Sequence, residues 1–100
     1  METSQVRYFL ALCEERNFSR AASRCGITQP SLTNAIRKLE RELGGPLFIR
    51  KPRIEPTDLG HVVLPYLKEI ARNIQGAREA ARSRSRAPTP PADCLTMGGA

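Results

Sequence analysis

The sequence predicts a small, mainly α-helical domain with one short pair of strands, and three observations support this fold class. Apolar residues recur at three- and four-residue spacing in several segments, and capping side chains or glycines stand at the ends of those segments. One segment between them has the run of apolar residues and the prolines that favour short strands. With 100 residues, 40% of them hydrophobic, the chain fits a single domain.

The first two helices are expected near the start of the chain. Apolar residues that share one helical face predict a helix from about residue 3 to about residue 15. These residues are Val6, Phe9, Leu10 and Cys13. Asn17 and Ser19 offer capping side chains ahead of a short second helix over residues 20–25, which Gly26 closes.

A third helix is expected to follow directly. Thr28 is a good N-cap, and Pro30 is tolerated in the first turn, where its missing N–H would have no helical partner. The inward stripe consists of Leu32, Ile36, Leu39 and Leu43. The outward face consists of Ser31, Thr33, Asn34, Arg37, Lys38 and Arg41. The helix is expected to stop at Gly44 and Gly45, ahead of Pro46.

Residues 47–56 are expected to form a hairpin. Residues 47–49 are apolar and predict a short strand, residues 50–53 form a basic tip, and residues 54–56 predict a return strand. Pro56 restricts that second strand to an edge position because it has no N–H to donate.

A fourth helix, capped by Thr57 or Asp58, is expected to run to about Arg82, which makes it roughly 37 Å long. Its near-heptad apolar stripe consists of Val63, Leu67, Ile70, Ile74, Ala77 and Ala81, and Leu59, Val62 and Tyr66 widen it. A head of about sixty residues is too small to cover this stripe, so a homodimer is expected. The alternative is a helix that folds back on its own head or frays beyond Gly76. Pro65 predicts a kink.

The charge is unevenly distributed along the chain. The formal net charge is +6 with a pI of about 9.9, and residues 16–53 hold nine basic and two acidic side chains. This excess favours a polyanionic partner. No apolar run is long enough to span a bilayer, and the first residues lack the pattern of a secretion signal, so a cytoplasmic protein is expected.

The cysteines and the single histidine predict neither a disulfide framework nor a metal site. Cys13, Cys25 and Cys94 are widely spaced, with no CxxC pair and only His61 as a possible partner ligand. Cys13 and Cys25 are expected to be small buried side chains. With no base–nucleophile pair and no phosphate-cradling glycine loop, we expect neither an enzyme nor a cofactor.

Two short helices joined by a tight turn, the second polar on its outer face, are typical of a DNA major-groove reader. Gln29 at the start of the third helix has an amide that pairs well with adenine, although it could serve only as a surface or capping residue. The hydroxyl groups expected at phosphates are those of Thr28, Ser31 and Thr33. For Asn34, base contact and simple solvation remain open; Arg37 and Lys38 are expected at phosphates.

Residues 18–50 begin with FSRAA and end with ITQPSLTNAIRKLERELGGPLFIR. They resemble the N-terminal signature of bacterial LysR-type transcriptional regulators. The likeness extends from about residue 3 to about residue 82. The short segment LTMG at residues 95–98 is similar to the first strand of that family's effector domain.

This resemblance implies a winged helix-turn-helix head over residues 1–58, a linker helix over residues 59–82 that dimerises antiparallel, and a hinge with the start of an effector domain, expected to be disordered, over residues 83–100. It implies binding to interrupted inverted repeats in promoter DNA, tetramers at full length, and no small-molecule ligand for this chain. The implied DNA-binding residues are Thr28, Gln29, Pro30, Ser31, Thr33, Asn34, Arg37, Lys38, Arg50 and Arg53. The implied dimer residues are Leu59, Val63, Tyr66, Leu67, Ile70, Ile74 and Ala77. Arg53 would enter a narrow minor groove or lie over a phosphate.

Three other functions are compatible with parts of the pattern. The chain could be a helical protein-interaction module whose basic face is only solvated, and a test of duplex DNA binding separates the two. A cysteine-based enzyme or redox switch would lose its activity when all three cysteines are replaced. An RNA-binding module would more often display exposed aromatic side chains than the five aromatics here, most of which have core spacing.

Overall fold

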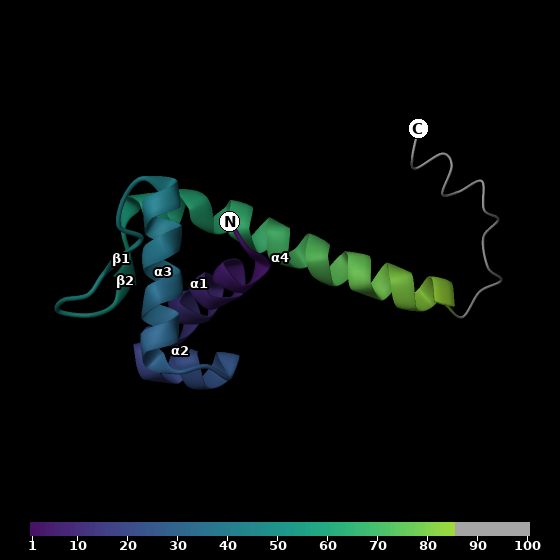
Figure 1. The fold of residues 1–100 in the computed structure, drawn as a ribbon. Coiled ribbons are helices and arrows are strands. Elements are labelled where there is room, and N and C mark those ends of the chain that lie inside the picture. The colour runs from purple at the N-terminus through teal and green to yellow at the C-terminus, as the bar shows by residue number, and fades with distance from the viewer. Residues whose placement is uncertain (86–100) are drawn as a thin grey trace.

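A computed structural model of the protein describes residues 1–85, so the expected effector-domain strand at residues 95–98 lies outside the described residues. The elements in chain order are α1 (Thr3–Glu15), α2 (Phe18–Cys25), α3 (Gln29–Leu43), β1 (Phe48–Ile49), β2 (Glu55–Pro56) and α4 (Asp58–Ser85). The first five elements form a head, and α4 starts within it and projects away as a single rod (Figure 1). The elongated molecule measures 57 × 27 × 20 Å. The mainly α fold with a two-stranded wing is confirmed.

The helix boundaries follow the capping residues. The Asn17 side chain accepts a hydrogen bond from the Arg20 N–H at 2.8 Å, so α2 begins at Phe18, two residues earlier than expected. The Thr28 side chain caps α3 by accepting from the Ser31 N–H at 3.3 Å. Gly26 ends α2 with a φ of 72°, a left-handed conformation that glycine adopts without strain.

The core lies where α1, α3, β1 and the first part of α4 meet. Its largest fully buried side chains are Phe9, Leu12, Leu32, Ile36, Leu39, Leu47 and Leu67. The rings of Phe9 and Phe48 pack with centroids 5.3 Å apart, which joins α1 to the base of the wing. Ala21 and Ala22 are buried, so α2 presents a small-residue face to the rest of the head. This core fixes α3 with one face buried.

The wing is antiparallel, with Phe48 opposite Pro56 and Ile49 opposite Glu55. Each strand is one residue shorter than expected, beginning at Phe48 and at Glu55. The first strand loses Leu47 because the Leu47 N–H, which would extend the ladder opposite Thr57, donates to a side chain of α3 instead. The Leu47 N–H donates to Glu40 Oε2 at 2.8 Å, and the Leu47 carbonyl accepts from the Thr57 N–H at 2.9 Å. The first contact anchors the base of the wing to α3, and the second continues the antiparallel register to Thr57, directly before α4.

The start of α4 is fixed by Thr57, whose hydroxyl accepts from the Gly60 N–H at 3.0 Å and donates to the Pro46 carbonyl at 2.7 Å. A Cβ on Gly60 would clash with the Leu47 carbonyl oxygen, so the absent side chain lets α4 approach the wing closely. The helix continues through Pro65 to Ser85, three residues beyond the expected end. None of the helices in residues 1–85 has the length and apolarity needed to cross a membrane.

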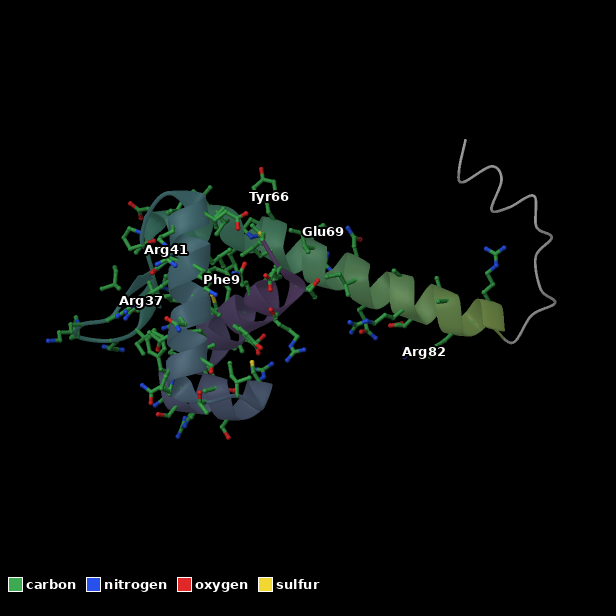
Figure 2. The ribbon with its side chains drawn as sticks, viewed as in Figure 1. Phe9, Arg37, Arg41, Tyr66, Glu69 and Arg82 are labelled. Atoms are coloured by element: carbon green, nitrogen blue, oxygen red, sulfur yellow. The ribbon has the colours of Figure 1, made fainter. Side chains whose placement is uncertain are left out.

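The apolar stripe of α4 divides between two faces, and this corrects part of the expected dimer surface. Leu67 is only 2% exposed and belongs to the core of its own head, with Leu59 and Val63 packed beside it. Tyr66, in contrast, is 71% exposed and points away from the head (Figure 2). The sequence assigned both groups to a partner because helical spacing identifies an apolar face but not what covers it.

Candidate nucleic-acid interface

The outer face of α3 is a polar and cationic surface held by a buried inner face. Leu32, Ile36 and Leu39 have no exposed area and fix the rotation of the helix about its axis. The predicted site residues of α3 therefore lie together on the other side, and all but the half-buried Thr33 are exposed. They are Gln29, Pro30, Ser31, Thr33, Asn34, Arg37 and Lys38.

At its N-terminus, α3 has two hydroxyl contacts that order the site. The Thr28 hydroxyl accepts from the Ser31 N–H and donates to Ser31 Oγ at 2.9 Å, so both side chains are already ordered by helix capping. Ser19, on α2, donates its Oγ hydrogen to Gln29 Oε1 at 3.0 Å. The sequence marks Ser19 only as a possible cap and does not predict this contact. The two residues are ten positions apart, and no periodicity links them.

Two shallow hollows run along the face of α3. The first is lined by Gln29, Pro30, Thr33, Asn34 and Arg37. The second is lined by Arg37, Glu40, Arg41, Gly44 and Gly45. Arg37 borders both, and Arg41 lies one helical turn beyond it (Figure 2). Arg41 is expected on the outer face but is absent from the predicted site residues, and its four-residue spacing from Arg37 is the signal that could have included it.

The wing brings Arg50 and Arg53 to different environments. The Arg50 guanidinium lies over the Phe18 ring, 5.0 Å from its centroid, and this cation–π contact ties the start of the wing to the start of α2. Arg53 is exposed between the two strands, together with Lys51. Arg50 is thus held against the head, whereas Arg53 lies out on the wing.

Two of the nine basic side chains between residues 16 and 53 form ion pairs with acidic residues. Arg16 lies 3.8 Å from Glu55, and Arg24 lies 2.6 Å from Glu14 and 3.2 Å from Glu15. The hydrogen bond that the exposed Arg24 donates to Glu14 raises the pKa of Arg24 above its usual value, and the charges of Glu14 and Glu15 raise it further. Within residues 1–85, the other seven form no ion pair. These seven are Arg20, Arg37, Lys38, Arg41, Arg50, Lys51 and Arg53.

The two described cysteines, Cys13 and Cys25, are free thiols and are half-buried, somewhat more open than the sequence predicted. Burial raises the pKa of Cys13 to about 11, against the opposing effects of Lys68 and Arg16. A protonated thiol is a poor nucleophile and a poor metal ligand. No cluster of three or more potential metal ligands occurs in the described part of the chain. Cys94 lies outside it.

A three-helix core that exposes the polar face of its third helix, followed by a two-stranded wing, defines a winged helix-turn-helix domain. Residues 3–61 match the family described as "Bacterial regulatory helix-turn-helix protein, lysR family". The chain belongs to this family.

Individual relatives agree with this family. The HTH-type transcriptional regulator IlvR of Caulobacter vibrioides is 43% identical over 83 residues, which cover 82% of this chain and 28% of IlvR. The HTH-type transcriptional regulator BudR of Klebsiella aerogenes is 41% identical over 87 residues, which cover 86% of this chain and 61% of BudR. The chain therefore spans less than two thirds of the length of either relative.

Solved structures show the same fold. The complex of BenM_DBD with catB site 1 DNA aligns with a TM-score of 0.80 and 32% identity, covering 85% of this chain and 96% of that one. A CbnR_DBD–DNA complex aligns with a TM-score of 0.73 and 38% identity, covering 87% of this chain and 99% of that one. The long C-terminal helix is thus part of the shared fold.

Proposed function

We propose that this chain binds double-stranded promoter DNA sequence-specifically, as the DNA-binding part of a LysR-type transcriptional regulator, with the N-terminal half of α3 in the major groove. The observation that carries this proposal is the exposed polar face of α3, surrounded by seven basic side chains without acidic partners among residues 1–85. The BenM_DBD–DNA and CbnR_DBD–DNA complexes support it by analogy. With this function the protein would act in the cytoplasm, at the nucleoid.

The proposed roles follow the position of each residue. Gln29 and Asn34 read base edges from the first turns of α3, where Pro30 lies at the groove surface. The hydroxyls of Thr28, Ser31 and Thr33 contact phosphate oxygens. The free backbone N–H groups and the partial positive charge at the start of α3 favour these contacts. Arg37, Lys38 and Arg50 neutralise phosphates, and Arg53 extends from the wing to a minor groove or a phosphate. Arg41 joins the phosphate-binding set because it shares a hollow with Arg37.

Binding of this kind must depend strongly on salt. Each phosphate contact displaces condensed counterions, so a protein that makes about six to ten contacts loses about three to five decades of affinity between 50 and 200 mM salt. Fluorescence anisotropy with a duplex selected from a randomised pool measures this slope. Affinity that is independent of salt would contradict the proposal.

Two substitutions separate base reading from phosphate binding. Gln29→Ala is expected to weaken binding to the selected duplex by about 1–3 kcal/mol and to leave binding to random-sequence duplex almost unchanged. Arg37→Ala is expected to weaken both duplexes alike, because phosphates carry no sequence information. Equal losses on both duplexes for Gln29→Ala would assign Gln29 a structural role only.

We also propose that residues 59–82 dimerise the chain antiparallel, while residues 1–58 form the DNA-binding head. The exposed apolar side chains on the free face of α4 support this, with Val62, Tyr66 and Ile70 being 62%, 71% and 38% exposed. Ala77 continues this face, and Ile74 lies at its margin. An inverted repeat in the DNA would match such a two-fold symmetric pair, and longer forms of the chain would assemble as tetramers.

Sedimentation velocity tests the dimer. Ile70→Glu is expected to convert the protein to a monomer by placing a charge in the apolar contact, whereas Gln75→Glu, which adds the same charge outside that face, leaves it dimeric. A monomer in the unsubstituted chain at micromolar concentration would contradict the dimer while leaving the DNA-binding head intact.

A further inference from the structure

The hydrogen bond between Ser19 and Gln29 bears on which base Gln29 would read. Ser19 is the second residue of α2 and Gln29 is the first residue of α3, and their side chains meet at 3.0 Å with the hydroxyl as donor. Both backbones are fixed, since Asn17 caps α2 and Thr28 caps α3. The bond therefore joins two ordered helix starts and restricts the rotation of the Gln29 side chain.

The direction of this bond makes the two ends of the Gln29 amide inequivalent. Its oxygen is engaged by Ser19, while no residue among 1–85 accepts a hydrogen bond from its nitrogen. Gln29 also borders the hollow lined by Asn34 and Arg37. Towards a ligand on this face, the side chain therefore offers two N–H donors more readily than it offers its acceptor.

The donor and acceptor patterns of the purines differ in the major groove. Guanine presents two acceptors, N7 and O6, whereas adenine presents the N7 acceptor beside the N6 donor. An amide that is free to rotate suits adenine, because it donates and accepts at once. An amide whose oxygen is already engaged by a neighbour suits guanine better, because both of its N–H donors are free while one of the two lone pairs of its oxygen is taken.

We propose that Ser19 is a positioning residue that holds the Gln29 amide oxygen and thereby makes Gln29 select guanine over adenine in the major groove. This inference rests on the proposed DNA-binding function and changes the base that amide chemistry alone would suggest. Ser19 itself needs no contact with a base. Its hydroxyl acts through the orientation of Gln29.

The test measures base preference with the whole 100-residue chain. A preferred duplex is selected from a randomised pool, and each of its base pairs is then changed to the other three. The base pair whose preference disappears in Gln29→Ala is the one that Gln29 reads. At that pair, guanine is expected to be preferred over adenine, and replacement of the guanine by 7-deazaguanine, which lacks the N7 acceptor, is expected to weaken binding.

Three variants of α2 isolate the hydroxyl of Ser19. Ser19→Ala is expected to reduce the guanine-over-adenine ratio by about three- to tenfold, the effect of losing one neutral hydrogen bond. Ser19→Thr retains the hydroxyl and is expected to retain the ratio. Ser23→Ala, an equivalent change at an exposed position of the same helix, is expected to alter neither the ratio nor the affinity. Affinity for random duplex should be equal in all four proteins.

The outcomes separate this inference from the function on which it rests. Adenine as the preferred base at the Gln29-dependent pair would overturn the inference, as would a Ser19→Ala variant that keeps the ratio or weakens all duplexes equally. A chain that binds no duplex, or a Gln29→Ala variant that keeps every base preference, would contradict the proposed base-reading function itself.

Discussion

The two parts of α4, residues 58–74 and residues 75–84, have apolar residues at similar helical spacing but entirely different surroundings. Along residues 58–74 one side of the helix packs on the head, where Leu67 is 2% exposed and Gly60 is buried. From residue 75 to residue 84 every side chain is exposed, and Figure 1 shows this part of the rod extending beyond the head. The first part is therefore held by contacts within its own protomer, whereas the exposed second part would be buried only by another surface.

An apolar stripe therefore identifies the side chains that must be buried, but not the surface that buries them. The first part of α4 is apolar on two sides: Leu67 faces the head, and Tyr66 faces away from it. Adjacent residues on a helix point about 100° apart, so two neighbouring stripes merge into one wide band when only the sequence is read.

Truncation of Leu67 should have the greatest effect on the stability of the head. Leu67→Ala should lower the free energy of unfolding by about 2–5 kcal/mol, because it leaves a cavity among fully buried side chains. Val62→Ala removes a similar side chain from a site that is 62% exposed and should change stability by less than about 0.5 kcal/mol. Urea unfolding, at a concentration below self-association, measures both. Equal effects would contradict the burial of Leu67 within one protomer.

The next effect is at Gly60, where α4 touches the wing. A Cβ there would clash with the Leu47 carbonyl oxygen and come within 3.1 Å of Pro56 Cβ. Gly60→Ala should therefore destabilise the head by about 1–3 kcal/mol, despite the higher helix propensity of alanine. Thermal unfolding followed by circular dichroism would detect the lowered Tm, and an unchanged Tm would mean that the helix and the wing do not meet so closely.

A pH-dependent effect is expected from Cys13, which lies on α1 and experiences the charge of Lys68 on α4. Its pKa is about 11 in the folded protein against an ordinary value of 9.0, so the unfolded chain loses the proton first. The stability that this thiol contributes is complete below pH 9 and is lost as the pH rises from 9 to 11. Urea unfolding across this range should show a steeper loss in the unsubstituted protein than in Cys13→Ala.

The matched control for that experiment is Cys25→Ala, which keeps Cys13 and should keep the steeper loss. Parallel curves for the unsubstituted protein and Cys13→Ala would show that Cys13 is solvated, and thus that the head is looser around α1 than the structure indicates.

The smallest expected effect, and the only stabilising one, is at Gly76 in the second part of α4. A Cβ at this position meets no atom within 4 Å, and the backbone is helical. Gly76→Ala should therefore raise stability by about 0.5–1 kcal/mol by lowering the conformational entropy of the unfolded chain. A destabilised variant, compared with Gly60→Ala in the same assay, would indicate that another surface packs tightly against Gly76 in solution.

Much of the fold was predictable because local chemistry specifies it. Asn17, Thr28 and Gly26 act within a few residues of their own positions, so the helix ends followed from the sequence to within about two or three residues. The exposed face of α3 was predictable for the same reason, since Leu32, Ile36 and Leu39 lie on one helical stripe. The start of the first wing strand was less predictable because the Leu47 N–H donates to the side chain of Glu40, which lies on α3 and not in the hairpin.

The ends of the helices, the polar face of α3 and the positive charge around it depend on neighbours within one or two helical turns, so they can be predicted from the sequence. Three features are visible only in the folded molecule: Leu67 lies inside its own head, Gly60 allows α4 to reach the wing, and Ser19 holds Gln29. Each of these depends on atoms from two elements meeting at contact distance, and the spacing of residues along one helix carries no information about such a meeting.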